Sequence, residues 1–374
     1  MANDTAPNSA AATAAFAPAA ACAAAAEQAE SRPVPARAGA KTVNLALQGG
    51  GAHGAFTWGV LDVLLEKDQL EIEGVSATSA GAMNAAVFAY GMAVGGRDGA
   101  RRALDRFWTG ISDAAATGPL QPSWYDKALA NWGLPWSPSF AAADMLSRVF
   151  SPYDLNPLNL NPLRDVLRSV VDFDVLRAPD APVKLFLSAT NVRTGRVKVF
   201  AREELSADAV LASACLPFLF PAVEIDGEAY WDGGYMGNPA IFPLIYGCES
   251  RDVVVVHINP VCRPEVPRSA RDILNRVNEI SFNSSLMREM RTIQFVTDLI
   301  DRGRVGDEMK RLLIHSIAAD DVMTRLGAAS KMNADRGFLR YMRDAGHRTA
   351  GEWLEANFDS LGRRSSLDIG AHYL

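Results

Sequence analysis

The sequence predicts an α/β protein whose mainly parallel central sheet is covered by helices on both faces. Two apolar runs, VNLAL at 43–47 and LEIEGVSATS at 70–79, read as strands, and each is followed by a segment with helical apolar spacing. Alternation of nearly continuous apolar strands with helices is typical of a parallel sheet buried on both faces. From about residue 269 the spacing becomes helical over a long stretch, which predicts a helical C-terminal extension.

The other elements follow from periodicity and turn residues. In chain order we expect a helix over 56–67, a buried helix over 80–96, an amphipathic helix over 101–111, two strands within 183–200 and a strand over 253–260.

The composition excludes several classes of protein. A net charge of -6 argues against a polyanionic partner, so no nucleic acid is expected. Four cysteines and five histidines show no metal-ligand spacing, so neither a metal nor a cofactor is predicted, and the free thiols suit a cytoplasmic location. No window gives about 18 uninterrupted apolar residues, so we expect no transmembrane span and at most peripheral contact with a membrane.

Composition also divides the chain. Residues 1–40, rich in Ala and Pro, predict a disordered tail, 41–265 a core and 266–374 a helical extension packed on it. A segment rich in Trp, Pro and Asn at about 110–165 interrupts the core. It is either a capping insertion with its own small core or an apolar lid over a hydrophobic substrate site.

A glycine-rich loop, QGGGAHGA, follows the first strand. Three of its glycines satisfy the dinucleotide pattern G-x-G-x-x-G, but the same glycines can direct backbone N–H groups at an oxyanion. In a dinucleotide site the second strand ends in an acidic residue. Here Glu71 and Glu73 lie near the beginning of that strand and Ser79 lies at its end, which favours acyl transfer.

Ser79 is the candidate nucleophile, in the sequence Ala-Thr-Ser-Ala-Gly at 77–81. A serine between a strand and a helix of small residues is typical of a nucleophile elbow, which exposes the hydroxyl above the sheet beside a helix N-terminus. The alternative interpretation is an ordinary serine N-cap at the start of a buried helix.

Asp232 is the candidate base. It precedes Gly233 and Gly234, whose freedom at positive φ lets a carboxylate point inward, although an Asp-Gly turn would give the same sequence. A second hypothesis adds a histidine, His257 or His315, to make a Ser–Asp–His triad in the chain order of α/β-hydrolases.

Four motifs together, QGGGAHGAF, ATSAGAMNA, LASACLPFLFPAV and YWDGGYMGNP, make the chain resemble the patatin-like phospholipase family over about 43–260. The resemblance implies a three-layer α/β/α sandwich and a serine lipid acyl hydrolase that cleaves fatty-acyl esters with a Ser79–Asp232 dyad through an acyl-enzyme. The oxyanion hole that it implies consists of Gly49, Gly50, Gly51, Ala52, His53 and Gly54, with N–H groups donated by Gly50, Gly51 and Ala52. The residues that it assigns to support of the elbow and the dyad loop are Ala77, Gly81, Gly233 and Gly234.

Two positions depart from the family pattern. Ala77 replaces the first glycine of the elbow, and His53 stands where arginine or lysine is frequent. A neutral His53 supplies less positive potential, which protonation below about pH 6.5 would partly restore. These departures keep open a weakly active or inactive lipid-binding protein as an alternative.

Overall fold

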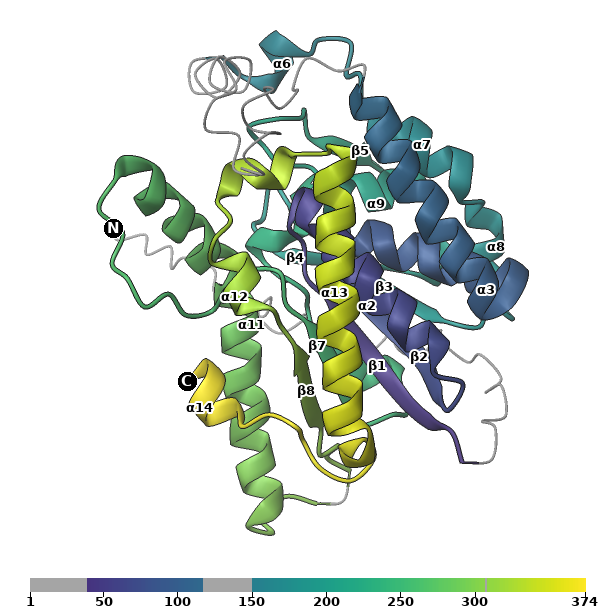
Figure 1. The fold of residues 1–374 in the computed structure, drawn as a ribbon, viewed down its shortest axis with the longest axis vertical. Coiled ribbons are helices and arrows are strands. Elements are labelled where there is room, and N and C mark those ends of the chain that lie inside the picture. Colours follow the sequence, from purple (N-terminus) through teal and green to yellow (C-terminus); the bar gives the residue numbers. More distant parts are fainter. Residues whose placement is uncertain (1–38, 117–149, 307) are drawn as a thin grey trace, which may run out of the picture.

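The computed structural model describes residues 39–116, 150–306 and 308–374 (Figure 1). The described strands form one sheet in the order β5-β6-β3-β2-β1-β7-β8, with β4 paired to β3. Their bounds are β1 Lys41–Leu47, β2 Leu70–Thr78, β3 Lys184–Asn191, β4 Val197–Ala201, β5 Val223–Ile225, β6 Glu228–Asp232, β7 Asp252–Val256 and β8 Leu313–Ile317. The pairs among β3, β2, β1, β7 and β8 are parallel, so their carboxyl ends share one edge.

Helices cover both faces of this sheet (Figure 1). The longer ones are α2 (Gly54–Glu66), α3 (Ala80–Ala116), α7 (Pro162–Val170), α9 (Ala207–Ser213), α11 (Ala270–Asp301) and α13 (Arg336–Asn357). The shorter ones are α6 (Pro152–Leu155), α8 (Phe173–Arg177), α10 (Phe242–Gly247), α12 (Asp320–Met323) and α14 (Ile369–Tyr373). Single 3-10 turns are η1 (Gly51–His53), η2 (Arg202–Glu204), η3 (Gly233–Tyr235), η4 (Ala328–Met332) and η5 (Phe358–Ser360).

Two hydrophobic cores lie on opposite faces of the sheet, because side chains alternate along a strand. In β1, Leu45 and Leu47 point into one core, which α2, α3, α9 and α13 complete. Ala46 points into the other, which is closed by side chains of α10, α11 and α14. The predicted fold class, a three-layer α/β/α sandwich with a mainly parallel sheet, is confirmed.

The elements depart from the predictions in two places. The helices expected over 80–96 and 101–111 are joined in α3, where Gly95 and Gly96 leave helical geometry and separate two helical segments. The region after residue 265 contributes a strand as well as helices: β8 pairs with β7 in parallel. Helix α13 from the same region packs along α2. The division of the chain near residue 265 stays a prediction.

Two further expectations concern parts of the chain that the structure does not describe. Residues 1–38 of the predicted tail (1–40) and most of the insertion at 110–165 lie outside the described residues. Among the helices that are described, none is both long and apolar enough to cross a bilayer.

Candidate active site

Ser79 lies in the turn between β2 and α3, with a φ of 55°. Such a left-handed conformation is unfavourable for a residue with a Cβ and is characteristic of a nucleophile elbow. Its backbone N–H donates to the Ser213 hydroxyl at 2.9 Å, and Ser213 in turn donates to the Ser188 carbonyl at 2.6 Å. Ser79 is therefore held in its unusual conformation by a side chain from α9.

The first turns of α2 and α3 meet at this elbow. A Cβ built on Gly54 would lie 2.7 Å from the Cβ of Ala80, and one built on Gly81 would lie 2.4 Å from the Leu47 carbonyl oxygen. Only glycine permits so close an approach at these two positions. Because helix N-termini carry partial positive charge, the first turns of both helices are favourable surroundings for an anion next to Ser79. Ala77, the departure from the family pattern, is completely buried in β2.

The strand register brings Asp232 to Ser79. Along β3, Ser188 pairs with Thr78 of β2, and the next residue, Ala189, pairs with Asp232 of β6. The opposite side of these two β3 residues is occupied by β4, so β6 continues the edge at which β2 ends. The last residue of β6 consequently lies beside the residue that follows β2.

The Asp232 carboxylate is completely buried. Its Oδ1 accepts the backbone N–H of Gly234 at 2.7 Å, and its Oδ2 has no hydrogen-bond partner of regular geometry among the described residues. Burial raises the pKa of Asp232 to about 6, against the Gly234 N–H, the side chain of Ser79 and the charge of Lys331, which all lower it. The carboxyl is thus a stronger base than an exposed aspartate, with one oxygen free to accept a proton.

The two dyad-loop glycines have separate steric reasons. A Cβ on Gly233 would lie 2.0 Å from the Ser188 carbonyl oxygen, so this residue must be small for η3 to follow β6. A Cβ on Gly234 would collide with the Phe282 ring of α11 at 2.2 Å. Positive φ, which the Asp-Gly-Gly sequence suggests for these two glycines, is not adopted by either of them. Close packing is the reason for glycine here.

The glycine loop divides into bonded and unbonded N–H groups. Gly49 donates to the Asn238 side chain at 2.7 Å, His53 to the Gly50 carbonyl at 3.2 Å, and Gly54 to carbonyls within the loop. The N–H groups of Gly50, Gly51 and Ala52 make no hydrogen bond to the described residues. Of the six loop residues that the resemblance implied, these three therefore have free donors. Gly49 lies against the elbow, since a Cβ built on it would lie 2.6 Å from the Cβ of Ser79.

The protonation state of His53 does not follow the expectation that mild acid gives its imidazole a positive charge. Its Nε2 bonds the Ser330 hydroxyl at 2.7 Å, and because that hydroxyl donates to the Gly327 carbonyl, Nε2 carries the proton. Burial, followed by the charge of Lys331, lowers the pKa of His53 to about 3. The imidazole is thus neutral at neutral and mildly acidic pH. The expectation that it gains a proton below about pH 6.5 is wrong.

Sequence reasoning missed the polar groups that hold the loop in place. Gln48 accepts the N–H groups of Ile258 and Asn259 at 2.9 and 3.0 Å, and the Asn259 side chain donates to the Gly49 carbonyl at 2.9 Å. Asn238 also holds the loop, through the Gly49 N–H, and Ser213 holds the neighbouring elbow, through the Ser79 N–H. Nothing in the local sequence distinguishes these residues, because each forms its hydrogen bonds with a partner that is distant in sequence.

The two histidines of the triad hypothesis have other hydrogen-bond partners. The Nε2 atom of His257 bonds the Tyr373 hydroxyl at 2.5 Å. His315, on β8, bonds Asp252 at 2.9 Å and the Ser366 hydroxyl at 3.0 Å. Neither forms a hydrogen bond to Ser79 or Asp232. The geometry favours a dyad over a triad.

The dinucleotide interpretation also finds no support at the second strand. Glu73 binds the N–H groups of Glu249 and Ser250, both at 2.8 Å, and the Lys184 ammonium at 3.1 Å. Ser79 lies six positions further along the chain, or about 20 Å along a strand. Glu73 thus ties the loop before β7 to the first residue of β3, at the opposite end of the sheet.

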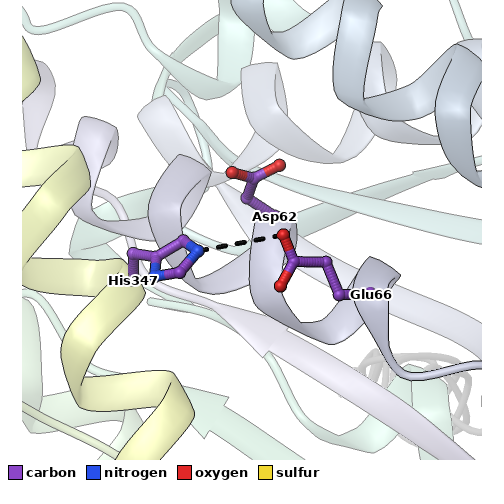
Figure 2. Close-up of side chains that lie close together, drawn as sticks. All are labelled: Asp62, Glu66 and His347. Carbon is purple, nitrogen blue, oxygen red and sulfur yellow. Dashed lines mark ion pairs between the residues drawn. The ribbon is translucent and has the colours of Figure 1, made fainter.

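One other group of side chains has a geometry that metals use (Figure 2). Ligand atoms of Asp62, Glu66 and His347 lie within 4.8 Å of one another. Both oxygens of Asp62 already pair with guanidiniums, Arg101 at 2.6 Å and Arg343 at 2.8 Å, and Arg101 also binds Glu66 at 2.9 Å. The group joins α2 to α3 and α13 at the end of α2 that is remote from the glycine loop.

Comparison with known proteins identifies the family. The family model described as patatin-like phospholipase matches residues 45–245, more than half of the chain. The chain belongs to the patatin-like phospholipase family. Membership in this family supports lipid acyl hydrolase activity, with a lipid as substrate. No curated protein matches this patatin-like chain.

Solved structures similar to this patatin-like phospholipase include VipD from Legionella pneumophila, with 19% identity, a TM-score of 0.38, and coverage of 84% of this chain and 67% of that one. ExoU of the Pseudomonas aeruginosa type III secretion system, in complex with SpcU, has 15% identity and a TM-score of 0.30. A second structure, of the type III effector protein ExoU, has 15% identity and a TM-score of 0.31. Each ExoU match covers 84% of this chain, which spans about half the length of ExoU (53%).

Proposed function

We propose that the protein hydrolyses fatty-acyl esters of lipids through a Ser79–Asp232 dyad and an acyl-enzyme intermediate. The observation that carries the proposal is the shared strand edge: β6 continues the edge of β2, so a buried carboxyl with a free oxygen lies beside a serine at positive φ. Three unbonded N–H groups of the glycine loop and two helix N-termini supply the electrostatic part of the site.

Acylation begins with proton transfer from the Ser79 hydroxyl to Asp232 Oδ2. The serine oxygen bonds to the ester carbonyl carbon, and the carbonyl electron pair moves onto its oxygen, which the N–H groups of Gly50, Gly51 and Ala52 stabilise. When the tetrahedral intermediate collapses, the bond to the leaving alcohol breaks and Asp232 returns the proton to that alcohol. Water repeats the sequence at the acyl carbon and releases the fatty acid.

The raised pKa of Asp232 matters for this chemistry. A carboxylate with an ordinary pKa near 4 is a weak base for a hydroxyl. Each unit by which burial raises the pKa of the carboxyl group narrows the difference between this pKa and that of the serine hydroxyl. A pKa of about 6 leaves the group ionised at neutral pH, so that it can still accept a proton. Burial thus supplies basicity that other serine hydrolases obtain from histidine.

Exposed apolar side chains lie near the site and offer a contact with a lipid surface. Six large apolar side chains are exposed around α6 and the loop after α9, and we call them the apolar lip: Phe150, Tyr153, Leu155, Leu158, Leu160 and Phe218. The Tyr153 hydroxyl accepts the Ala222 N–H at 3.2 Å, and the Cys215 carbonyl accepts the Asp232 N–H at 2.7 Å. One loop, 214–222, therefore touches both the lip and the dyad.

Exposed apolar side chains next to a lipid-cleaving site suit peripheral insertion into a lipid surface. We expect a change of Leu158 and Leu160 to aspartate to slow hydrolysis of phosphatidylcholine vesicles while leaving a soluble short-chain ester unaffected. Val94→Asp is the control, because Val94 is also exposed but lies at the far end of the first segment of α3. Peripheral membrane contact of this kind fits a cytoplasmic protein.

The experiment that tests the dyad is covalent labelling with a fluorophosphonate, followed by peptide mapping and assays with a short-chain p-nitrophenyl ester. Label on Ser79, together with loss of ester hydrolysis in Ser79→Ala, supports the proposal. Equal hydrolysis by Ser79→Ala and the unchanged protein refutes it. Lipid binding without labelling or turnover would instead favour the lipid-binding alternative.

A further inference from the structure

The turn η4 packs directly on the glycine loop. The carbonyl oxygen of Lys331 lies 2.3 Å from where a Cβ on Gly51 would be, and Gly51 has a φ of 58°. The preceding residue, Ser330, accepts the His53 hydrogen bond. Two consecutive residues from beyond position 325 thus hold the loop that carries the free N–H groups.

The Lys331 ammonium lies between the glycine loop and the dyad loop. It donates to the Asn259 side-chain oxygen at 2.7 Å, and Asn259 donates to the Gly49 carbonyl at 2.9 Å. On its other side it stands 5.6 Å from the centroid of the Phe282 ring, which occupies the space above Gly234. The side chain is half-buried.

The charges around this ammonium are few. Lys331 faces Glu279 of α11, Arg263 after β7, Asp232 at the end of β6 and His53 of η1. Glu279 is already paired with Arg263 at 2.6 Å and with Arg276 at 3.3 Å, and His53 is neutral. Asp232 is therefore the one carboxylate among these groups that has no guanidinium partner. Burial lowers the pKa of Lys331 to about 8, against the charges of Glu279 and Asp232.

We propose that Lys331 supplies the positive charge of the oxyanion loop, a charge that the neutral His53 within the loop does not carry. This inference rests on the proposed dyad. During acylation the negative charge moves from Asp232 to the substrate oxygen, which the loop N–H groups bind. Lys331, linked through Asn259 to Gly49 and in backbone contact with Gly51, stabilises the charge after that transfer. It is a positioning residue that acts through the loop, and it touches none of the reacting atoms.

The test compares Lys331→Met and Lys331→Arg in the full chain, with a p-nitrophenyl butyrate assay and a phosphatidylcholine vesicle assay. We expect Lys331→Met to lower kcat about 10- to 100-fold on both substrates with little change in KM. This is less than the effect of about 100-fold or more for a donor that binds the oxyanion itself, because Lys331 acts through the loop. Lys331→Arg should retain most of the activity. The wild-type rate should fall above about pH 8, the pKa of Lys331, and that decline should shift to higher pH in the arginine variant.

The matched control is Lys310→Met. Lys310 is also half-buried, and its ammonium donates to the main-chain carbonyl groups of Ile245 and Cys248, but it lies at the opposite edge of the sheet. The Lys310→Met variant should lose stability but should keep the kcat of the wild type. Melting temperatures of all variants separate loss of folding from loss of charge.

Three results would overturn the inference. One is a Lys331→Met protein with wild-type kcat. Another is a loss of activity confined to the phospholipid, which would assign Lys331 to headgroup binding. The third is a loss of activity that is as large in Lys331→Arg as in Lys331→Met, together with a melting temperature that falls equally in both variants. The Ser79 labelling described above is independent of all three, so failure of the dyad is recognised separately.

Discussion

The hydroxyl of Ser213 accepts the backbone N–H of Ser79 at 2.9 Å while donating to the Ser188 carbonyl at 2.6 Å. One side chain therefore fixes the elbow to β3, the strand to which both β2 and β6 are paired. Because Asp232 is held by the same strand, Ser213 sets the position of the nucleophile relative to its base. All three residues are buried.

Ser213→Ala is expected to lower kcat about 10- to 100-fold, because misplacement of a nucleophile by about 1 Å costs about 100-fold. The control is Ser206→Ala, which removes the N-cap hydrogen bond to Ala209 at the other end of α9. Both changes should lower the free energy of unfolding by about 1 kcal/mol. Steady-state kinetics that fail to distinguish the two variants would contradict the role of Ser213.

The conformation of Ser79 predicts an unusual stability ranking. A residue with a Cβ at a φ of 55° costs about 1–2 kcal/mol relative to glycine. Ser79→Gly should therefore unfold at a higher denaturant concentration than Ser79→Ala, although neither hydrolyses esters. If alanine is the more stable of the two, the elbow is not strained and its assignment weakens.

Gly51 and Gly195 form a matched pair, because both have positive φ, 58° and 65°. A methyl group on Gly51 would meet the Lys331 carbonyl at 2.3 Å, whereas one on Gly195 would meet nothing within 4 Å. Gly51→Ala should reduce activity about 100-fold or more by displacing the loop donors. Gly195→Ala should lose only about 1 kcal/mol of stability and no activity, as measured by kinetics and chemical denaturation.

The parts of the site that could be predicted from sequence are those encoded in short local patterns. Ser79 and Asp232 each stand at the end of an apolar run beside small residues, and this is visible without a structure. Ser213 and Lys331 are not recognisable in this way. Their contacts join residues more than 130 and 270 positions apart, and a serine in a short helix or a lysine in a 3-10 turn has no distinctive local pattern.

The same distinction explains the missed strand. The sequence LIHSI of β8 is five residues long and lies within a region of helical periodicity. Short apolar runs are ambiguous between buried helix and strand, and only pairing with β7 decides. The lowered pKa of His53 is likewise not predictable from the loop sequence. It results from burial of the ring by residues that are distant along the chain.

The pH dependence of Asp232 gives the last prediction. Since its pKa is about 6 in the folded protein, kcat/KM should fall about tenfold per pH unit below pH 6 as the base becomes protonated. Burial raises this pKa above the ordinary aspartate value of 3.8, so the ionised group destabilises the folded state above pH 6, whereas the protonated group below pH 4 does not. Asp232→Asn should therefore abolish hydrolysis yet raise the free energy of unfolding at pH 8 by up to about 3 kcal/mol. That gain should decline as pH falls from 6 to 4, as measured by denaturant unfolding at each pH. A variant less stable than wild type at pH 8 and unchanged across this range would mean that the carboxylate is stabilised in the folded state, contrary to its burial.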